Sequence, residues 1–323
     1  MIKTLEIKNF KSIKHQKLDC KRINVLIGEP NTGKSNILEA LGIFSFGAYS
    51  NYSDFKDFVR FERTNNLFYD ESIDEDIEIK FDNKALNIKF KDGQFLGIWK
   101  EEQEEIVRIA GSYENLQFAG GNRDKLSAFK FYRFAVQKGF PRPDSDFLLP
   151  PSGANLMSLI QTHKELRTTA NQLFSHFGLR LGLRPQEHKI EVIKQLEDII
   201  ISYPYSLASD TLQRLVFYLA AISTNKDSVL VFEEPESHAF PYYTKYFAER
   251  VALDEKNNQY FISTHNPYFL LPLLEKAPKE DVAVFITYFE DYQTKVKLLS
   301  EKEMEEITEI DVFSNIDRFL EKA

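Results

Sequence analysis

The fold is decided by residues 28–35, which read Gly28-Glu29-Pro30-Asn31-Thr32-Gly33-Lys34-Ser35. This stretch matches the pattern G-x-x-x-x-G-K-[ST] without a gap. An apolar run (INVLI) precedes it, and helix-periodic apolar residues follow it from about Lys34 to Phe44. A buried strand, a glycine-rich turn and a helix are therefore predicted, in that order.

The residue types of this loop suit a chain of phosphates. The glycines let the backbone approach closely, and the N–H groups of Thr32 to Ser35 point inward at a helix N-terminus. Lys34 brings a positive charge to the β- and γ-phosphates, and the Ser35 hydroxyl is a hard oxygen ligand for Mg²⁺. The predicted binding residues are Gly28, Asn31, Thr32, Gly33, Lys34, Ser35 and Asn36.

A second motif is the apolar run SVLVF (228–232), which ends in two adjacent carboxylates, Glu233 and Glu234. Acids at the end of a buried strand are costly unless they serve a cation or a water molecule. Glu233 is predicted to bind Mg²⁺ together with Ser35, and Glu234 to polarise the attacking water. The alternative is a solvated strand end without function.

His265 follows the next apolar run, QYFIST (259–264). A lone histidine is more often structural than functional. This one, however, ends a candidate parallel strand, at the sheet edge where ligands gather in α/β proteins. Glu234, His265 and Lys34 are therefore the predicted catalytic residues, with His265 in contact with the γ-phosphate.

Four segments in this order resemble the ABC-type ATPases of the RecF, SMC and OLD group, and in particular a small OLD-like ATPase without a nuclease domain. They are GEPNTGKSN (28–36), LASDTLQR (207–214), LVFEEPESH (230–238) and ISTHNP (262–267). The opening LEIKNFKSI and the segment LLPPSGANLMSLI (148–160) are also similar to that group. The resemblance implies ATP and Mg²⁺ as cofactors.

The resemblance also implies an ATP-dependent homodimer. In the family, the segment that matches LASDTLQR contacts the γ-phosphate held by the opposite subunit, so Ser209 would bind ATP in trans. Asp210 stands where the family has glycine, and its side chain is expected to point away from the phosphate or to cap the helix. His238 is an interface candidate.

Some family positions have no clear match. Asn65 and Asn66 are guesses for the glutamine of the Q-loop, and Lys11 and Ser12 are candidates near the adenine.

Composition fits a cytoplasmic protein of 323 residues with 43% hydrophobic content. The chain has one cysteine, Cys20, and no apolar run long enough to span a membrane. The N-terminus lacks the apolar run of a signal peptide. A net charge of −8 does not support DNA binding, although local basic patches could still allow it.

The predicted fold is α/β: a P-loop ATPase head with a mostly parallel central sheet, an antiparallel β layer and a helical lid. Residues 1–60 and 205–300 are assigned to the head, 61–204 to the β layer and lid, and 301–323 to a C-terminal helix. Within these, 16–27 is predicted as one strand and 153–177 as one helix.

Two functions remain open at this point. One is an ATPase that couples hydrolysis to DNA metabolism or to control of a phage-defence effector, a separate nuclease or toxin. The other is a slow-turnover regulatory or scaffold module for such an effector. A transporter's ATPase subunit is disfavoured, because LEIKNFKSI and the long segment between the motifs suit the RecF-like side better.

Overall fold

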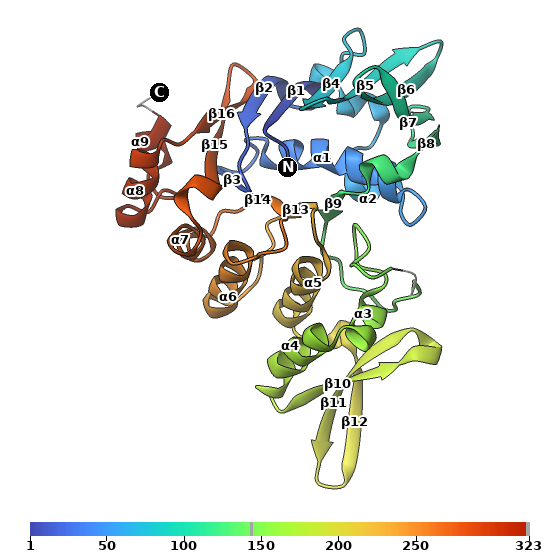
Figure 1. Cartoon of the computed structure of the whole chain (residues 1–323), viewed down its shortest axis with the longest axis vertical. Coiled ribbons are helices and arrows are strands. Elements are labelled where there is room, and N and C mark those ends of the chain that lie inside the picture. The colour runs from blue at the N-terminus through green and yellow to red at the C-terminus, as the bar shows by residue number, and fades with distance from the viewer. Residues whose placement is uncertain (143–144, 321–323) are drawn as a thin grey trace.

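A six-stranded, mostly parallel sheet forms the centre of the computed structural model, which describes residues 1–142 and 145–320 (Figure 1). The strand order is β16-β15-β3-β14-β13-β9, and within the described chain only β16 runs antiparallel to its neighbour. The central strands are buried on both faces, as their continuous apolar sequences require. The bounds are β3 (Ile23–Gly28), β9 (Phe129–Tyr132), β13 (Val229–Glu233), β14 (Gln259–Ser263), β15 (Val282–Glu290) and β16 (Gln293–Leu298).

Helix α1 (Lys34–Tyr49) lies between this sheet and a second, antiparallel one (Figure 1). It is buried on all sides, which explains its apolar sequence without a polar face. Phe44 of α1 bridges the two sheets, with its ring centroid 4.9 Å from that of Phe81 and 5.2 Å from that of Phe129. The helix after the glycine-rich loop is thus fixed from both sides.

The antiparallel sheet has seven strands in the order β2-β1-β4-β5-β6-β7-β8. Its strands alternate between buried and exposed residues, as expected when one face covers α1 and the other meets water. The bounds are β1 (Thr4–Phe10), β2 (Ile13–Asp19), β4 (Ile77–Phe81), β5 (Lys84–Lys91), β6 (Gln94–Glu101), β7 (Glu104–Gly111) and β8 (Leu116–Gly121).

Three helices cover the other face of the parallel sheet: α5 (Asp210–Thr224), α6 (Pro241–Ala252) and α7 (Pro267–Lys276). Aromatic side chains dominate this second core. Phe247 of α6 lies 5.9 Å from Phe269 of α7 and 6.1 Å from Phe232 of β13, measured between ring centroids.

The lid consists of α3 (Leu156–Thr162), α4 (Lys164–Ser175) and a three-stranded antiparallel sheet. The sheet contains β10 (Leu179–Arg184), β11 (Lys189–Leu196) and β12 (Ile199–Pro204), and it extends away from the two large sheets (Figure 1). Helix α4 packs on α5 and on β10, so the lid is anchored at the start of α5.

The remaining elements are short. They are α2 (Phe55–Phe58), α8 (Glu301–Glu309), α9 (Ile316–Leu320) and the 3-10 turns η1 (Thr64–Leu67), η2 (Tyr69–Glu71), η3 (Arg123–Leu126), η4 (Pro185–Glu187), η5 (Tyr205–Leu207) and η6 (Lys279–Asp281). Among the described residues, no helix has the length and apolar character needed to cross a membrane.

The predicted α/β class is confirmed, and the parallel sheet, antiparallel layer and helical lid are all present. Three element predictions need correction. Residues 16–27 form two strands in different sheets, because the Asn24 side chain bonds the backbone of Lys21 and turns the chain there. The helix expected at 153–177 is two helices that meet at the extended residue His163. The C-terminal segment forms α8 and α9 rather than one helix, and its residues 321–323 lie outside the described chain.

The sheets also cross the predicted boundary at residue 60. β1 and β2, assigned to the head, belong to the antiparallel sheet with β4–β8. β9, assigned to the β layer, pairs with β13 in the parallel sheet. Head and β layer therefore share one compact body around α1.

Candidate active site

The glycine-rich loop joins β3 to α1 and is held by two close backbone approaches. Gly28 has φ 148°, and a Cβ there would lie 2.3 Å from the Thr287 carbonyl oxygen. Gly33 has φ 94°, and a Cβ there would lie 2.0 Å from Thr294 Oγ1. Only glycine fits at either position, because both the left-handed φ and the contact exclude a side chain.

Thr32 and Asn31 shape the middle of the loop. The Thr32 hydroxyl donates to the Glu29 carbonyl over 2.8 Å and lies 2.7 Å from Thr287 Oγ1. Asn31 is exposed and has φ 63°, a left-handed conformation that asparagine tolerates well. The loop therefore curves around the first turn of α1, whose leading N–H groups have no partner within the helix.

Lys34 lies inside this curve. Its Nζ donates to the carbonyl oxygens of Gly28 and Glu29, both over 2.7 Å, and the residue is 8% exposed. Burial lowers the pKa of the Lys34 ammonium, and the carboxylates of Glu234 and Glu29 oppose that shift. β13, β14 and β3 are neighbouring parallel strands, so the second acidic motif at the end of β13 lies at the same sheet edge as the loop.

Ser35 lies beside the other carboxylate of that motif, close enough for its hydroxyl to lower the pKa of Glu233. Burial would raise the pKa of Glu233, but the Ser35 hydroxyl and the charges of Arg60 and Arg133 outweigh it and hold the pKa below its ordinary value. A hydroxyl and an ionised carboxylate at one point are the hard oxygen donors that Mg²⁺ takes alongside phosphate oxygens and water. The two predicted metal ligands thus fit Mg²⁺.

Two arginines that the sequence did not single out flank Glu233. Arg60 Nη2 lies 2.8 Å from Glu233 Oε1, and Arg133 Nη2 lies 3.2 Å from Oε2. Both arginines also contact Glu39 of α1, which is fully buried, at 2.7 and 3.1 Å. Arg133 follows β9 directly, so its place at the carboxyl edge of a parallel strand is the one signal that could have found it.

Lys11 completes this charge cluster around the buried Glu39. Its Nζ contacts Glu39 and also donates to the Arg60 carbonyl oxygen over 2.7 Å. Lys11, suggested as an adenine neighbour, is thus also a partner of Glu39, and its place near the adenine stays a prediction. Ser12 lies closer to the loop: its Oγ accepts from Asn36 Nδ2 over 2.7 Å and lies 2.6 Å from Thr294 Oγ1.

Glu234 and His265 form a pair at the ends of β13 and β14. Glu234 Oε1 lies 3.3 Å from His265 Nδ1, and the side chains are 38% and 59% exposed. The Glu234 backbone has φ 42°, and its N–H donates to the Ser263 carbonyl over 3.1 Å. This left-handed turn gives the carboxylate of Glu234 a direction different from that of Glu233.

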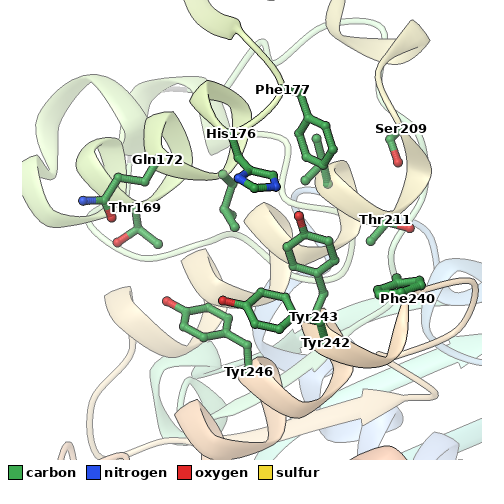
Figure 2. A pocket seen from close by; sticks show the side chains of 12 residues that line it. Thr169, Gln172, His176, Phe177, Ser209, Thr211, Phe240, Tyr242, Tyr243 and Tyr246 are labelled. Carbon is green, nitrogen blue, oxygen red and sulfur yellow. The ribbon is translucent and has the colours of Figure 1, made fainter.

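Ser209 lies apart from these residues. It is exposed, precedes α5 and makes no capping hydrogen bond with its own side chain. Together with Thr211 it lines a cavity of about 840 Å³ whose other walls come from α4 and α6, with no contribution from residues 28–36 (Figure 2). The Asp210 side chain lies along α5, with its Oδ2 3.3 Å from Nε of Arg214, four residues further along the helix.

The guesses for the Q-loop, Asn65 and Asn66, stay predictions. The side-chain amides of Asn65 and Asn66 both donate to Glu71, in the segment that precedes β4. His238 is exposed, and its carbonyl accepts from Thr211 Oγ1 over 2.9 Å.

The chain is similar to known ATPases in sequence. Residues 1–147 match the family model of the AAA ATPase domain. The chain is 22% identical to an ATP/GTP phosphatase of Helicobacter pylori, over 99% of this chain and 98% of that protein. It is 27% identical to the DNA replication and repair protein RecF of Clostridium tetani, over 68% of this chain and 61% of the RecF protein.

The fold is similar to that of SMC head domains. An SMC head bound to the C-terminal winged-helix domain of ScpA matches with a TM-score of 0.54 and 17% identity, over 94% of this chain and 99% of that one. An SMC head with an extended coiled coil, bound to the C-terminal domain of ScpA derived from Pyrococcus furiosus, matches with a TM-score of 0.55 and 14% identity. That match covers 95% of this chain and 98% of the other.

Proposed function

We propose that this chain, an ABC-type ATPase of the RecF/SMC-like group, binds Mg²⁺ and ATP, pairs head-to-tail with a second copy around two ATP molecules, and reopens after hydrolysis. The observation that carries the proposal is the convergence of Ser35 and Lys34 with Glu233 and Glu234 at one edge of the parallel sheet, from segments far apart in the sequence. The coupled process is the control of a separate effector protein or a step in DNA metabolism.

The phosphate chain would lie against the loop backbone. The leading N–H groups of α1 bind its oxygens, and the helix dipole favours their negative charge. Lys34 Nζ would leave the carbonyl oxygens of Gly28 and Glu29 and bind the β- and γ-phosphates instead. The flexible lysine side chain allows this change of partners. When bound through Ser35 and Glu233, Mg²⁺ neutralises charge on the same phosphate oxygens.

Hydrolysis would use the second acidic pair. Glu234 accepts a proton from a water molecule as the water oxygen attacks the γ-phosphorus and the bond to the ADP oxygen breaks. His265 contacts one carboxylate oxygen of Glu234. From the same sheet edge it would also contact the γ-phosphate. Both side chains are partly exposed, so water can reach them.

The second copy would complete the site through Ser209. Support comes from the surface around it: Phe177, Phe240 and Tyr242, which line the same cavity, are 53%, 67% and 67% exposed (Figure 2). Apolar rings beside a bare helix N-terminus are costly in water and suit a face that another protein surface covers. In a head-to-tail pair, this face meets the phosphate loop of the second copy.

The test is the molar mass of the protein in solution, measured by light scattering with and without ATP and Mg²⁺. Wild type is expected to be monomeric without ATP. Glu234→Gln should still bind ATP, hardly hydrolyse it, and accumulate as a dimer. The matched control is Glu255→Gln, at an exposed residue after α6 that is not among the proposed site residues. This variant should behave as wild type. Turnover by Glu234→Gln at the wild-type rate would refute the role of Glu234.

A slow-turnover regulatory or scaffold module is the second candidate, and Asp210 favours it. An aspartate directly after Ser209 brings negative charge toward a phosphate held by the other subunit, and its pairing with Arg214 offsets only part of that charge. Asp210→Gly should then raise the rate of ATP hydrolysis. An unchanged rate in Asp210→Gly would favour the first candidate.

A further inference from the structure

Glu236 is a buried carboxyl close to the proposed catalytic pair. It lies two residues after Glu234, is 2% exposed, and its Oε1 accepts a hydrogen bond from Thr264 Oγ1. Its Oε2 has no hydrogen-bond partner among the described residues. Burial raises the pKa of Glu236 to about 7, even though the Thr264 hydrogen bond acts in the opposite direction. An apolar residue would fill this space at lower cost, so the contact with Thr264 needs an explanation.

Thr264 organises the turn that carries His265. Its hydroxyl accepts from the Asn266 backbone N–H over 3.1 Å, and its own N–H donates to the Leu26 carbonyl over 3.0 Å. A hydroxyl has one proton. Because the Thr264 hydroxyl donates its one proton to Glu236, its oxygen lone pairs are left to accept from the Asn266 N–H. The backbone on both sides of His265 is therefore fixed by one hydroxyl whose orientation Glu236 sets.

The segment that carries Glu236 is itself rigid. The Ser237 N–H donates to the Glu234 carbonyl over 3.0 Å, and the Ala239 N–H donates to the Glu236 carbonyl over 2.9 Å. Thr211 then ties the segment to α5 through the His238 carbonyl. These hydrogen bonds fix the position of Glu236, which in turn binds Thr264 in the turn after β14.

We propose that Glu236 is a positioning residue for ATP hydrolysis: through the Thr264 hydroxyl, it holds His265 against Glu234. The inference rests on the proposed function, in which Glu234 activates water. The contact of 3.3 Å between Glu234 Oε1 and His265 Nδ1 would thus depend on the hydrogen bond between Thr264 and Glu236. Neither Thr264 nor Glu236 is proposed to touch the substrate.

The kinetic test compares two pairs of variants. Thr264→Val and Glu236→Leu remove the bond and should lower kcat for ATP by about tenfold to a hundredfold, with KM almost unchanged, since a displaced catalytic group costs rate rather than substrate binding. Thr264→Ser keeps the hydroxyl and Glu236→Gln keeps the acceptor oxygen, so both should retain kcat within about threefold. Unchanged kcat in Thr264→Val and Glu236→Leu, or equal loss in Thr264→Ser, would overturn the proposal.

A structural role is separated from a positioning role by the double variant Thr264→Val with Glu236→Leu. Removing both partners leaves neither the Glu236 carboxyl nor the Thr264 hydroxyl buried without a partner, and only the part-buried Asn266 N–H loses an acceptor. This variant should therefore unfold at a urea concentration closer to that of wild type than either single variant does. Its kcat should nevertheless stay as low as that of Thr264→Val. Recovery of kcat in the double variant would mean that the bond only stabilises the fold.

A readout that needs no turnover keeps the two proposals apart. The histidine ring signals in the NMR spectrum of ¹³C-histidine-labelled protein, with His265→Gln as the assignment control, report the surroundings of His265. The His265 signal should move in Thr264→Val and stay in Thr264→Ser. If wild type proves inactive while this pattern holds, the proposed function fails and the positioning role stands. If the His265 ring signal has the same chemical shift in Thr264→Val as in wild type, the positioning role alone is overturned.

Discussion

Arg133 Nη2 lies 3.2 Å from Glu233 Oε2, the carboxylate proposed to bind Mg²⁺. The same nitrogen lies 3.1 Å from Oε1 of the fully buried Glu39, and Arg60 bridges the same two acids. A buried carboxylate on α1 therefore positions the cations that hold Glu233 ionised. The charge state of the proposed metal site thus depends on a residue of the helix that follows the glycine-rich loop.

Glu39→Gln should be among the most destabilising substitutions of a polar residue in this chain. It leaves Lys11, Arg60 and Arg133 facing one another without their common anion. Breaking a buried ion pair from one side costs about 3 to 5 kcal/mol of unfolding free energy. Urea denaturation measures this loss. Glu78→Gln, which breaks only the partly exposed pairs with Lys8 and Lys80, is the control and should cost about 1 kcal/mol or less.

Lys34→Ala should abolish measurable ATP binding, because it removes the ammonium group that lies within the curve of the loop formed by residues 28–33. Isothermal titration calorimetry with ATP and Mg²⁺ provides the measurement. Lys56→Ala, at an exposed lysine of the segment after α1, is expected to bind as wild type. ATP binding by Lys34→Ala with wild-type affinity would place the nucleotide elsewhere.

Two inactive variants should complement each other if the sites are shared between copies. Lys34→Ala damages the glycine-rich loop, and Ser209→Arg damages the face that would meet the loop of the other copy. In a mixed dimer, one of the two sites therefore combines an intact loop with an intact face. An equal mixture should recover about a quarter of the wild-type rate, because half of the random dimers are mixed and each has one working site of two.

The matched control is a mixture of Lys34→Ala with Glu234→Gln, which damage the same half-site. That mixture should stay inactive. Recovery in both mixtures, or in neither, would contradict the head-to-tail arrangement.

Stability should depend on pH through Glu236. Its pKa is raised from an ordinary 4.5 to about 7, so the folded protein holds this proton more tightly than the unfolded chain does. The stabilisation by the neutral acid is fully present below about pH 4.5 and is lost as pH rises through about 7. Relative to Glu236→Gln, wild type should therefore lose roughly 3 kcal/mol of unfolding free energy between about pH 5 and pH 8.

Urea denaturation of both proteins across this range measures the difference. The neighbouring charged groups, Glu234 and His265 on the sheet edge and Arg214 on α5, are common to both proteins and cancel. A difference between the two proteins that stays constant with pH would show that Glu236 titrates normally.

The phosphate loop was predictable because all of its parts are contiguous. A strand, two glycines, a lysine and a hydroxyl follow one another, and each has one physical role there. Glu233, Glu234 and His265 were predictable as candidates because each ends an apolar strand, and parallel strands bring their carboxyl ends to one edge.

The charge cluster around Glu39 was not predictable from sequence. Its members come from four separate segments, and none stands in a pattern that differs from an ordinary surface charge. Likewise, no glycine or proline marks the point within 16–27 where the chain leaves one sheet for another, although the burial pattern changes from mixed in β2 to continuous in β3. Register and sheet membership depend on distant partners that the local sequence does not contain.

The strand that carries the phosphate loop has both of its neighbours at the far end of the chain. β3 pairs only with β14 and β15 among the described strands, and both lie beyond residue 258. During synthesis on the ribosome, the loop emerges early while the strands that fix it are still untranslated. The loop can therefore take its folded shape only after nearly the whole polypeptide has been made, and a prematurely terminated product would carry the motif without the strands that hold it.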